Sequence, residues 1–296
     1  RDAYWRHGSI CENYSAVKAA TLAIGGWGDA YKNAVSHLVE NLRAPVKGIV
    51  GPWVHKYPHF AVPEPRIGFL QEALRWWDHW LKNCDQNIEQ DPDYTVYLME
   101  GVRPKTWYES RAGHWIAETN WPNSLQHHTL HLQSDHRLGM NAAKLSEVVK
   151  SPQTCGAASG EYCAIWLGPE MPGDQRGDDA FSACFTSEPL QEQMDIVGAP
   201  KLQLRLSSDK PAAQIAVRLN HIHPDGAATR ITYGVLNLAH RNGHEKSEAL
   251  IPGTDIDIEL ALDQIAYRVP KGHTIRVAIS TSSWPLLWPV AEAAEI

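Results

Sequence analysis

The sequence has no long uninterrupted apolar stretch and no excess of basic residues. Every hydrophobic run is broken by glycine, proline or a charged residue well before the roughly 20 residues that a membrane-spanning helix needs. The 296 residues include 27 Lys and Arg against 34 Asp and Glu, which gives a formal net charge of −7. A nucleic-acid-binding protein needs a basic surface to neutralise phosphates. We therefore expect neither nucleic acid nor a membrane as a partner.

Cysteine is also scarce, and its spacing matches no known metal or disulfide pattern. The five cysteines include no C-x-x-C pair, and no histidine cluster lies at zinc-finger distance from them. We therefore expect reduced thiols, no cofactor, no metal and a cytoplasmic location. The chain begins with Arg1, without a methionine or a signal-peptide pattern, so we expect it to be a piece of a longer polypeptide.

Residues 1–88 alternate between strand and helix patterns. Short apolar runs ended by glycine occur at 21–24 and 46–50, as is typical of buried parallel strands. Apolar residues recur at helical spacing over 31–42 and 66–82. This order predicts an α/β sheet with only two or three strands, too few for a complete doubly wound domain.

Residues 89–296 have a period of two instead. Alternating segments predict half-buried antiparallel strands at 94–99, 202–206, 215–219, 231–235, 256–260 and 275–279. The turn signal at 224–226 predicts a hairpin. Segment 151–187 has no period, and we expect a structured loop on the surface or over a cleft. The fold class is thus α/β plus all-β, divided near residue 88, with a sandwich or jelly roll at 89–296.

Two loops that follow the first two predicted strands carry side chains suited to catalysis. Asp29 lies in GGWGDAY at 25–31, and His55 ends GPWVH at 51–55. In open α/β sheets, catalytic groups gather at the carboxyl ends of the strands. Asp followed by His is the order that α/β-hydrolases use behind their nucleophile. Three alternatives remain open: Asp29 as a helix N-cap, His55 as a surface or core histidine, and His59 as a competing base.

These two blocks resemble the Asp and His blocks of the CocE/NonD-type serine hydrolases and the X-Pro dipeptidyl-peptidases of peptidase family S15. The segment GFLQEALRWWDHWLK at 68–82 is similar to the closing helix of their hydrolase domain. PGDQR at 172–176, HPDG at 223–226 and WPLLWP at 284–289 are similar to their C-terminal jelly roll. The resemblance implies the C-terminal portion of an α/β-hydrolase sheet at 1–88, followed by a jelly-roll β-sandwich at 89–296.

The resemblance also implies a serine hydrolase that cleaves ester or amide bonds, X-Pro dipeptide bonds among them, through a Ser–Asp–His triad. Asp29 and His55 would be triad members. Trp27 and Trp53 would line the substrate pocket, or else pack the two loops against the sheet. The family carries its nucleophile on a G-x-S-x-G elbow upstream of the Asp block, and this sequence has no such motif. We therefore expect the serine to precede Arg1 and this chain alone to be inactive.

A second class of function is a non-catalytic β-sandwich that serves as a binding or interaction module. The expected partner is a small-molecule ester, amide or peptide substrate; the choice among peptidase, esterase and acylase stays open, as does homo-oligomerisation. His221 and His223 share one strand face and could chelate a metal, but the sequence offers no evident third ligand. Four charged residues at 174–179 are expected to form a solvated or interdomain salt-bridge cluster, not a substrate-recognition site.

Overall fold

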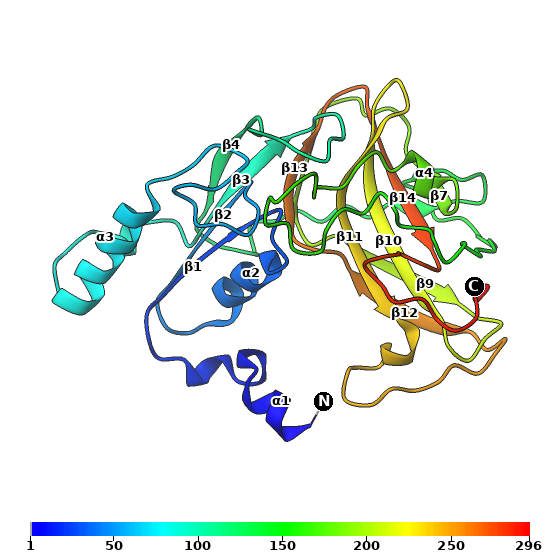
Figure 1. Cartoon of the computed structure of the whole chain (residues 1–296), viewed down its shortest axis with the longest axis horizontal. Helices are drawn as coiled ribbons and strands as arrows, with labels where there is room; N and C mark the ends of the chain where they lie inside the picture. Colours follow the sequence, from blue (N-terminus) through cyan, green and yellow to red (C-terminus); the bar gives the residue numbers. More distant parts are fainter. Residues whose placement is uncertain (1) are drawn as a thin grey trace.

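A computed structural model describes residues 2–296 (Figure 1). The chain opens with a short helix and two 3-10 turns, and then alternates between strand and helix. The first elements are α1 (Ala3–His7), η1 (Ile10–Glu12), η2 (Tyr14–Ala16), β1 (Thr21–Gly26), α2 (Lys32–Asn41), β2 (Val46–Gly51), α3 (Phe69–Lys82) and η3 (Ile88–Gln90). β1 and β2 pair in parallel, with Thr21 opposite Val46. The predicted strand–helix–strand–helix order is confirmed.

The main sheet continues from this α/β part into the β-rich part of the chain. β3 (Tyr94–Glu100) pairs in parallel with β2 and in antiparallel fashion with β4 (Gly113–Glu118). The far end of β3 pairs in parallel with β13 (Ile265–Val269), which pairs with β8 (Met194–Gly198). The sheet order is thus β1-β2-β3-β13-β8, with β4 on β3. The domain boundary near residue 88 stays a prediction.

The remaining strands form smaller antiparallel sheets, and three of the long strands lie side by side in Figure 1. The four-stranded sheet has the order β11-β10-β14-β7. Its members are β11 (Ala228–Asn237), β10 (Gln214–Ile222), β14 (Thr274–Ser280) and β7 (Ala183–Thr186). The two-stranded sheets pair β12 (Ile256–Ala261) with β9 (Lys201–Leu206), and β5 (His131–Leu132) with β6 (Leu138–Gly139). The short helical segments α4 (Arg176–Asp179) and η4 (Leu238–His240) complete the chain.

All six segments with alternating apolar residues form strands, so that part of the prediction is confirmed. The predicted hairpin joins β10 to β11, where the His223 N–H donates to the Ala227 carbonyl at 2.9 Å and Gly226 adopts a φ of 85°. The sequence did not predict β4, β7, β8 or β13. No helix in residues 2–296 is long and apolar enough to cross a membrane. Within the same residues, none of the five cysteines forms a disulfide.

The apolar stripe of α3 is exposed. Ala73 and Trp76 are buried, whereas the stripe that includes Leu74, Trp77 and Leu81 is more than half exposed. Figure 1 shows α3 standing at the edge of the molecule, away from the β-rich part. Hydrophobic residues at helical spacing therefore identified the helix correctly, but within residues 2–296 they do not form its buried face.

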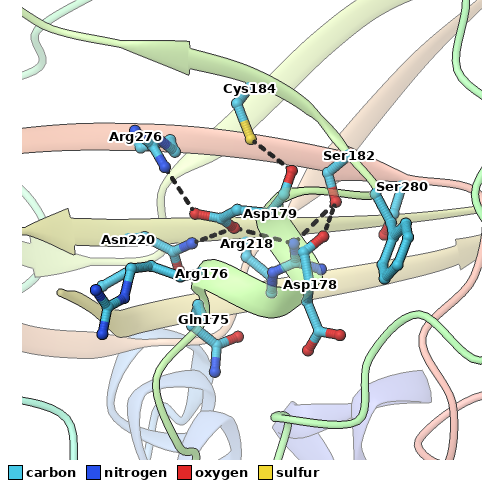
Figure 2. Close-up of polar contacts among 12 residues, drawn as sticks. Gln175, Arg176, Asp178, Asp179, Ser182, Cys184, Arg218, Asn220, Arg276 and Ser280 are labelled. Carbon is cyan, nitrogen blue, oxygen red and sulfur yellow. Dashed lines mark hydrogen bonds and ion pairs between the residues drawn. The ribbon is translucent and has the colours of Figure 1, made fainter. Parts of the chain in front are cut away.

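The cluster at 174–179 was predicted to be solvated or to form interdomain salt bridges; its two residues Asp178 and Asp179 are buried, so the solvated alternative is wrong for them, whereas Asp179 does form ion pairs. Asp178 and Asp179 in α4 are 4% and 6% exposed. The Asp178 carboxylate accepts the backbone N–H groups of Gly156 and Ala158 at 2.8 and 2.9 Å, which secures an earlier part of the 151–187 segment. Asp179 lies among two arginines and an asparagine of the four-stranded sheet (Figure 2). Burial of a carboxylate becomes tolerable when donors of this kind replace water.

Candidate active site at the ends of β1 and β2

The structure brings Asp29 and His55 together at one edge of the main sheet. Asp29 follows β1 by three residues, and His55 follows β2 by four. Because β1 and β2 are parallel neighbours, their carboxyl ends meet at the same edge. His55 Nδ1 lies 2.8 Å from Asp29 Oδ2. The two residues that the sequence analysis chose, because each follows a predicted strand, therefore form a hydrogen-bonded pair.

Backbone hydrogen bonds hold the two loops in register. The Trp27 N–H donates to the Gly51 carbonyl at 2.9 Å, and the Gly28 N–H donates to the Trp53 carbonyl at 2.8 Å. A Cβ at Gly26 would lie 2.2 Å from the Trp53 carbonyl oxygen, a distance that no side chain tolerates. The glycines that end β1 thus permit the close approach that places Asp29 beside His55.

The two carboxylate oxygens of Asp29 have different tasks. Oδ1 accepts the Tyr31 N–H at 2.9 Å at the start of α2, and Oδ2 faces His55. Asp29 is not the N-cap of α2, a position that Tyr31 occupies, so the N-cap alternative is wrong; its carboxylate instead accepts the N–H of that residue and contacts the histidine as well. The first contact fixes the orientation of the carboxylate for the second.

The histidine of the pair is accessible, whereas its carboxylate partner is mostly buried. The Asp29 side chain is 13% exposed, whereas that of His55 is 51% exposed. With Nδ1–H donating to the carboxylate, the lone pair of the imidazole lies on Nε2. In residues 2–296 no hydrogen bond occupies Nε2. This nitrogen can therefore accept a proton from a group that approaches from the exposed side.

The predicted loop at 151–187 lies against this pair. The His55 N–H donates to the Ala164 carbonyl at 2.8 Å. Ligand atoms of Cys163, Asp29 and His55 lie within 4.8 Å of one another, a spacing that could also hold a metal ion. The sequence did not point to Cys163 or Ala164 individually, because no period or motif links the segment to residue 55.

Glu170 holds this loop in shape. Its carboxylate accepts backbone N–H groups from Ile165 at 2.6 Å, Trp166 at 2.7 Å and Gly168 at 3.0 Å, and also from Leu167. Burial raises the pKa of Glu170, but the four backbone donors stabilise its ionised form more strongly, so the pKa lies below its usual range. The ionised carboxylate thus organises the turn that follows Ala164.

The family follows from comparison with known proteins. Residues 86–296 match the X-Pro dipeptidyl-peptidase C-terminal non-catalytic domain, and residues 1–57 match the X-Pro dipeptidyl-peptidase (S15 family). The chain belongs to the X-Pro dipeptidyl-peptidase S15 family. The first of these matches covers most of the chain, and both agree with the resemblance seen in the sequence motifs.

Curated relatives of this S15-family chain are mycobacterial. It is 24% identical to "Putative serine esterase Mb1866c" of Mycobacterium bovis and to "Putative serine esterase MT1883" of Mycobacterium tuberculosis. Each alignment covers 94% of this chain and 46% of the relative. The chain thus spans about half the length of the curated relatives that it matches.

Solved structures share its fold. An aminopeptidase from the marine sediment archaeon Thaumarchaeota archaeon superposes with a TM-score of 0.76 at 18% identity, covering 99% of this chain and 55% of that one. An α-amino acid ester hydrolase gives 0.75 at 17% identity, with coverages of 99% and 56%. A CocE/NonD family hydrolase from Staphylococcus aureus gives 0.72 at 12% identity, with 99% and 54%. At these identities the likeness shows the fold, a mixed α/β arrangement with several sheets and few helices.

The two tryptophans beside the pair of this S15-family chain are both buried. Trp53 is 1% exposed and its Nε1–H donates to the Pro65 carbonyl at 2.7 Å. Trp27 is 6% exposed, donates to the Tyr97 carbonyl at 2.8 Å, and borders a cavity of about 80 Å³. Their role in substrate binding stays a prediction. His59 stacks on Phe69, with ring centroids 5.8 Å apart, and is not the partner of Asp29.

Glu170 leads to a pH prediction. Because its pKa is lowered in the folded state, its stabilising effect is present above the unfolded pKa of about 4.3 and is lost as the pH falls through the folded pKa. We expect Glu170→Gln to lower the melting temperature at neutral pH, and this difference from the wild type to shrink below about pH 4. Calorimetry of both proteins across the pH range measures it. A difference that stays constant down to the acid limit would contradict the ionised-state role.

Proposed function

We propose that this chain supplies the Asp and the His of a Ser–Asp–His triad in an S15-type serine hydrolase. Asp29 orients His55, and His55 activates a serine that lies outside this chain. The observation that carries the proposal is the 2.8 Å Nδ1–Oδ2 contact at the ends of two parallel strands. Two facts support an external serine: the sequence lacks a G-x-S-x-G elbow, and the curated relatives are about twice as long.

The proposed fold follows the same division. Residues 1–88 are the C-terminal portion of an α/β-hydrolase sheet, and residues 89–296 are a jelly-roll β-sandwich. The parallel β1–β2 pair supports the first assignment, and the antiparallel order β11-β10-β14-β7 supports the second. The chain alone would be inactive, because it holds the base without the nucleophile.

The geometry of the pair defines the chemistry. His55 Nε2 takes the proton of the serine hydroxyl as its oxygen attacks an ester or amide carbonyl. The carboxylate of Asp29, on the opposite side of the ring, stabilises the imidazolium that forms. The imidazolium then gives its proton to the leaving group, and the same cycle with water releases the acyl group. The substrates are therefore esters, amides or peptides, X-Pro peptides among them.

Labelling of the full-length protein with a fluorophosphonate probe tests the role of His55. The probe reacts with an activated serine, so we expect His55→Ala to slow labelling by at least about 100-fold. His59→Ala, which removes an exposed histidine that does not pair with Asp29, should label at the wild-type rate. Labelling of His55→Ala at an unchanged rate would remove this histidine from the triad.

A second candidate function is a non-catalytic module. It is favoured by one observation, that residues 86–296 match a domain described as non-catalytic. In that case the β-rich part binds a partner or shapes a site without joining the chemistry. A full-length protein that no fluorophosphonate labels, but that folds normally, would favour this function over the first.

A further inference from the structure

Three histidines from three different segments meet at one end of the four-stranded sheet. His221 lies near the end of β10, His223 lies in the β10–β11 turn, and His273 immediately precedes β14. Their ring centroids are 4.0 Å apart for His221 and His223, 4.8 Å for His221 and His273, and 5.3 Å for His223 and His273. One ligand nitrogen from each lies within 4.8 Å of the other two. The structure thus supplies the third ligand that the sequence did not reveal.

We propose that His221, His223 and His273 form a binding site for one divalent transition-metal ion, of which Zn²⁺ is the first candidate. The donors are three imidazoles without a carboxylate, a set that suits zinc, nickel or copper and not magnesium or calcium. Three protein ligands leave a fourth tetrahedral position for water. This site is separate from Asp29 and His55 and goes beyond the proposed hydrolase function.

The ring of His223 is oriented by a second layer of hydrogen bonds. The Thr229 hydroxyl donates to the Val102 carbonyl at 2.7 Å, so its oxygen accepts from His223 Nε2–H at 3.0 Å. This fixes the tautomer and leaves the lone pair of His223 on Nδ1. Histidines that bind metals are commonly held in this way by a partner on the other ring nitrogen.

His221 is held by the same kind of contact. Its Nδ1 lies 2.9 Å from the Tyr267 hydroxyl, and its Nε2 lies 2.6 Å from His273 Nδ1. Two facing nitrogens at that distance share a proton, which a metal ion can replace. A Cβ at Gly101 would lie 2.8 Å from His221 Cε1, so the glycine there leaves room for the ring.

Between His221 and His273, metal binding requires only a small movement. Zn–N bonds of about 2.0–2.1 Å at a tetrahedral angle set neighbouring ligand nitrogens about 3.3 Å apart. The His221–His273 nitrogens must therefore separate by about 0.7 Å from their present 2.6 Å. His221 is fully buried and His223 is 7% exposed, whereas His273 is partly exposed in a turn. His273 is thus the ligand that can move most easily.

Burial disfavours the charged form of all three imidazoles. Burial, followed by the proximity of His223 and His273, lowers the pKa of His221 to about 3. Burial also lowers the pKa of His223 and of His273. The nearby Arg103 guanidinium is engaged by Asp225 in an ion pair.

The test is zinc binding by the full-length protein after removal of metals with a chelator. We expect one equivalent of Zn²⁺ after dialysis, measured by elemental mass spectrometry, and its loss in His273→Ala. Two matched controls disrupt the other clusters with metal-binding spacing, Cys163→Ser beside Asp29 and His79→Ala beside Glu89. Both controls should keep the equivalent of zinc. Substitution with Co²⁺ should give the visible bands of a four-coordinate site without thiolate charge transfer.

A variant in the second layer separates ligation from folding. Tyr267→Phe keeps the ring volume and removes the hydroxyl that contacts His221, so we expect zinc affinity to fall by about 10–100-fold. This variant carries the test if His273→Ala does not fold. Failure of the wild-type protein to bind Zn²⁺, unchanged binding in His273→Ala or Tyr267→Phe, or loss of zinc in Cys163→Ser would each overturn the proposal. Fluorophosphonate labelling is independent of this outcome.

Discussion

If the proposed triad operates, replacement of Asp29 by asparagine should lower the kcat of the full-length protein by about 10⁴, the size of the effect of this change in a serine protease triad. The asparagine amide can donate to His55 Nδ1, which forces the ring proton onto Nε2 and removes the lone pair that accepts the serine proton. The fold should be unaffected, because an asparagine oxygen can still accept the Tyr31 N–H that Asp29 Oδ1 now accepts at 2.9 Å. Turnover of a chromogenic ester substrate measures the loss.

A matched control for this variant is Asp93→Asn. Asp93 also pairs with a basic side chain, Lys47 at 3.1 Å, but its side chain is 48% exposed and it immediately precedes β3. Its kcat should stay within about twofold of the wild type, as for most surface substitutions. If Asp29→Asn behaved like this control, the orienting carboxylate would have to be sought elsewhere and the proposed triad would fail.

The contact between Asp29 and His55 could be predicted from sequence because it depends only on short segments that are close together in the chain. Each residue follows a short apolar run by a few positions, and parallel strands joined by one helix place their ends at the same edge. The glycines around both loops also belong to the motifs that reveal the family. Contacts between nearby segments of regular structure are therefore within reach of spacing and pattern.

Contacts between residues far apart in the sequence could not be predicted from sequence patterns. The Ala164 carbonyl contacts His55 from a segment without any period, and His273 joins His221 only through the antiparallel register of β10 and β14. Even Asp179, in a loop rich in glycine and charge, gave no sign of burial. Its donors lie on separate strands, and all nine residues of β10 are buried, so alternation could not show which face they occupy.

Replacement of Asp179 by asparagine is expected to lower the free energy of unfolding by about 3–5 kcal/mol. The Asp179 carboxylate accepts from Arg218 and Arg276, both at 3.1 Å, and from Asn220 at 3.0 Å (Figure 2). The side chains of Arg218 and Asp179 are only 3% and 4% exposed. Loss of the negative charge would leave the Arg218 guanidinium buried without an acidic partner. Most of the lost stability comes from this uncompensated buried charge and less from the lost attraction between the two side chains. Denaturant unfolding measures the change.

Two further variants separate this explanation from a general disturbance of the fold. The double variant Asp179→Asn, Arg218→Met also removes the buried guanidinium charge that the single variant leaves unpaired. It should therefore recover most of the stability that Asp179→Asn loses. Asp174→Asn alters the partly exposed pair with Arg176, and should change stability little because water screens such pairs. A double variant less stable than Asp179→Asn alone would mean that packing and hydrogen bonds of Arg218, including the one to Ser182 at 2.9 Å, matter more than its charge.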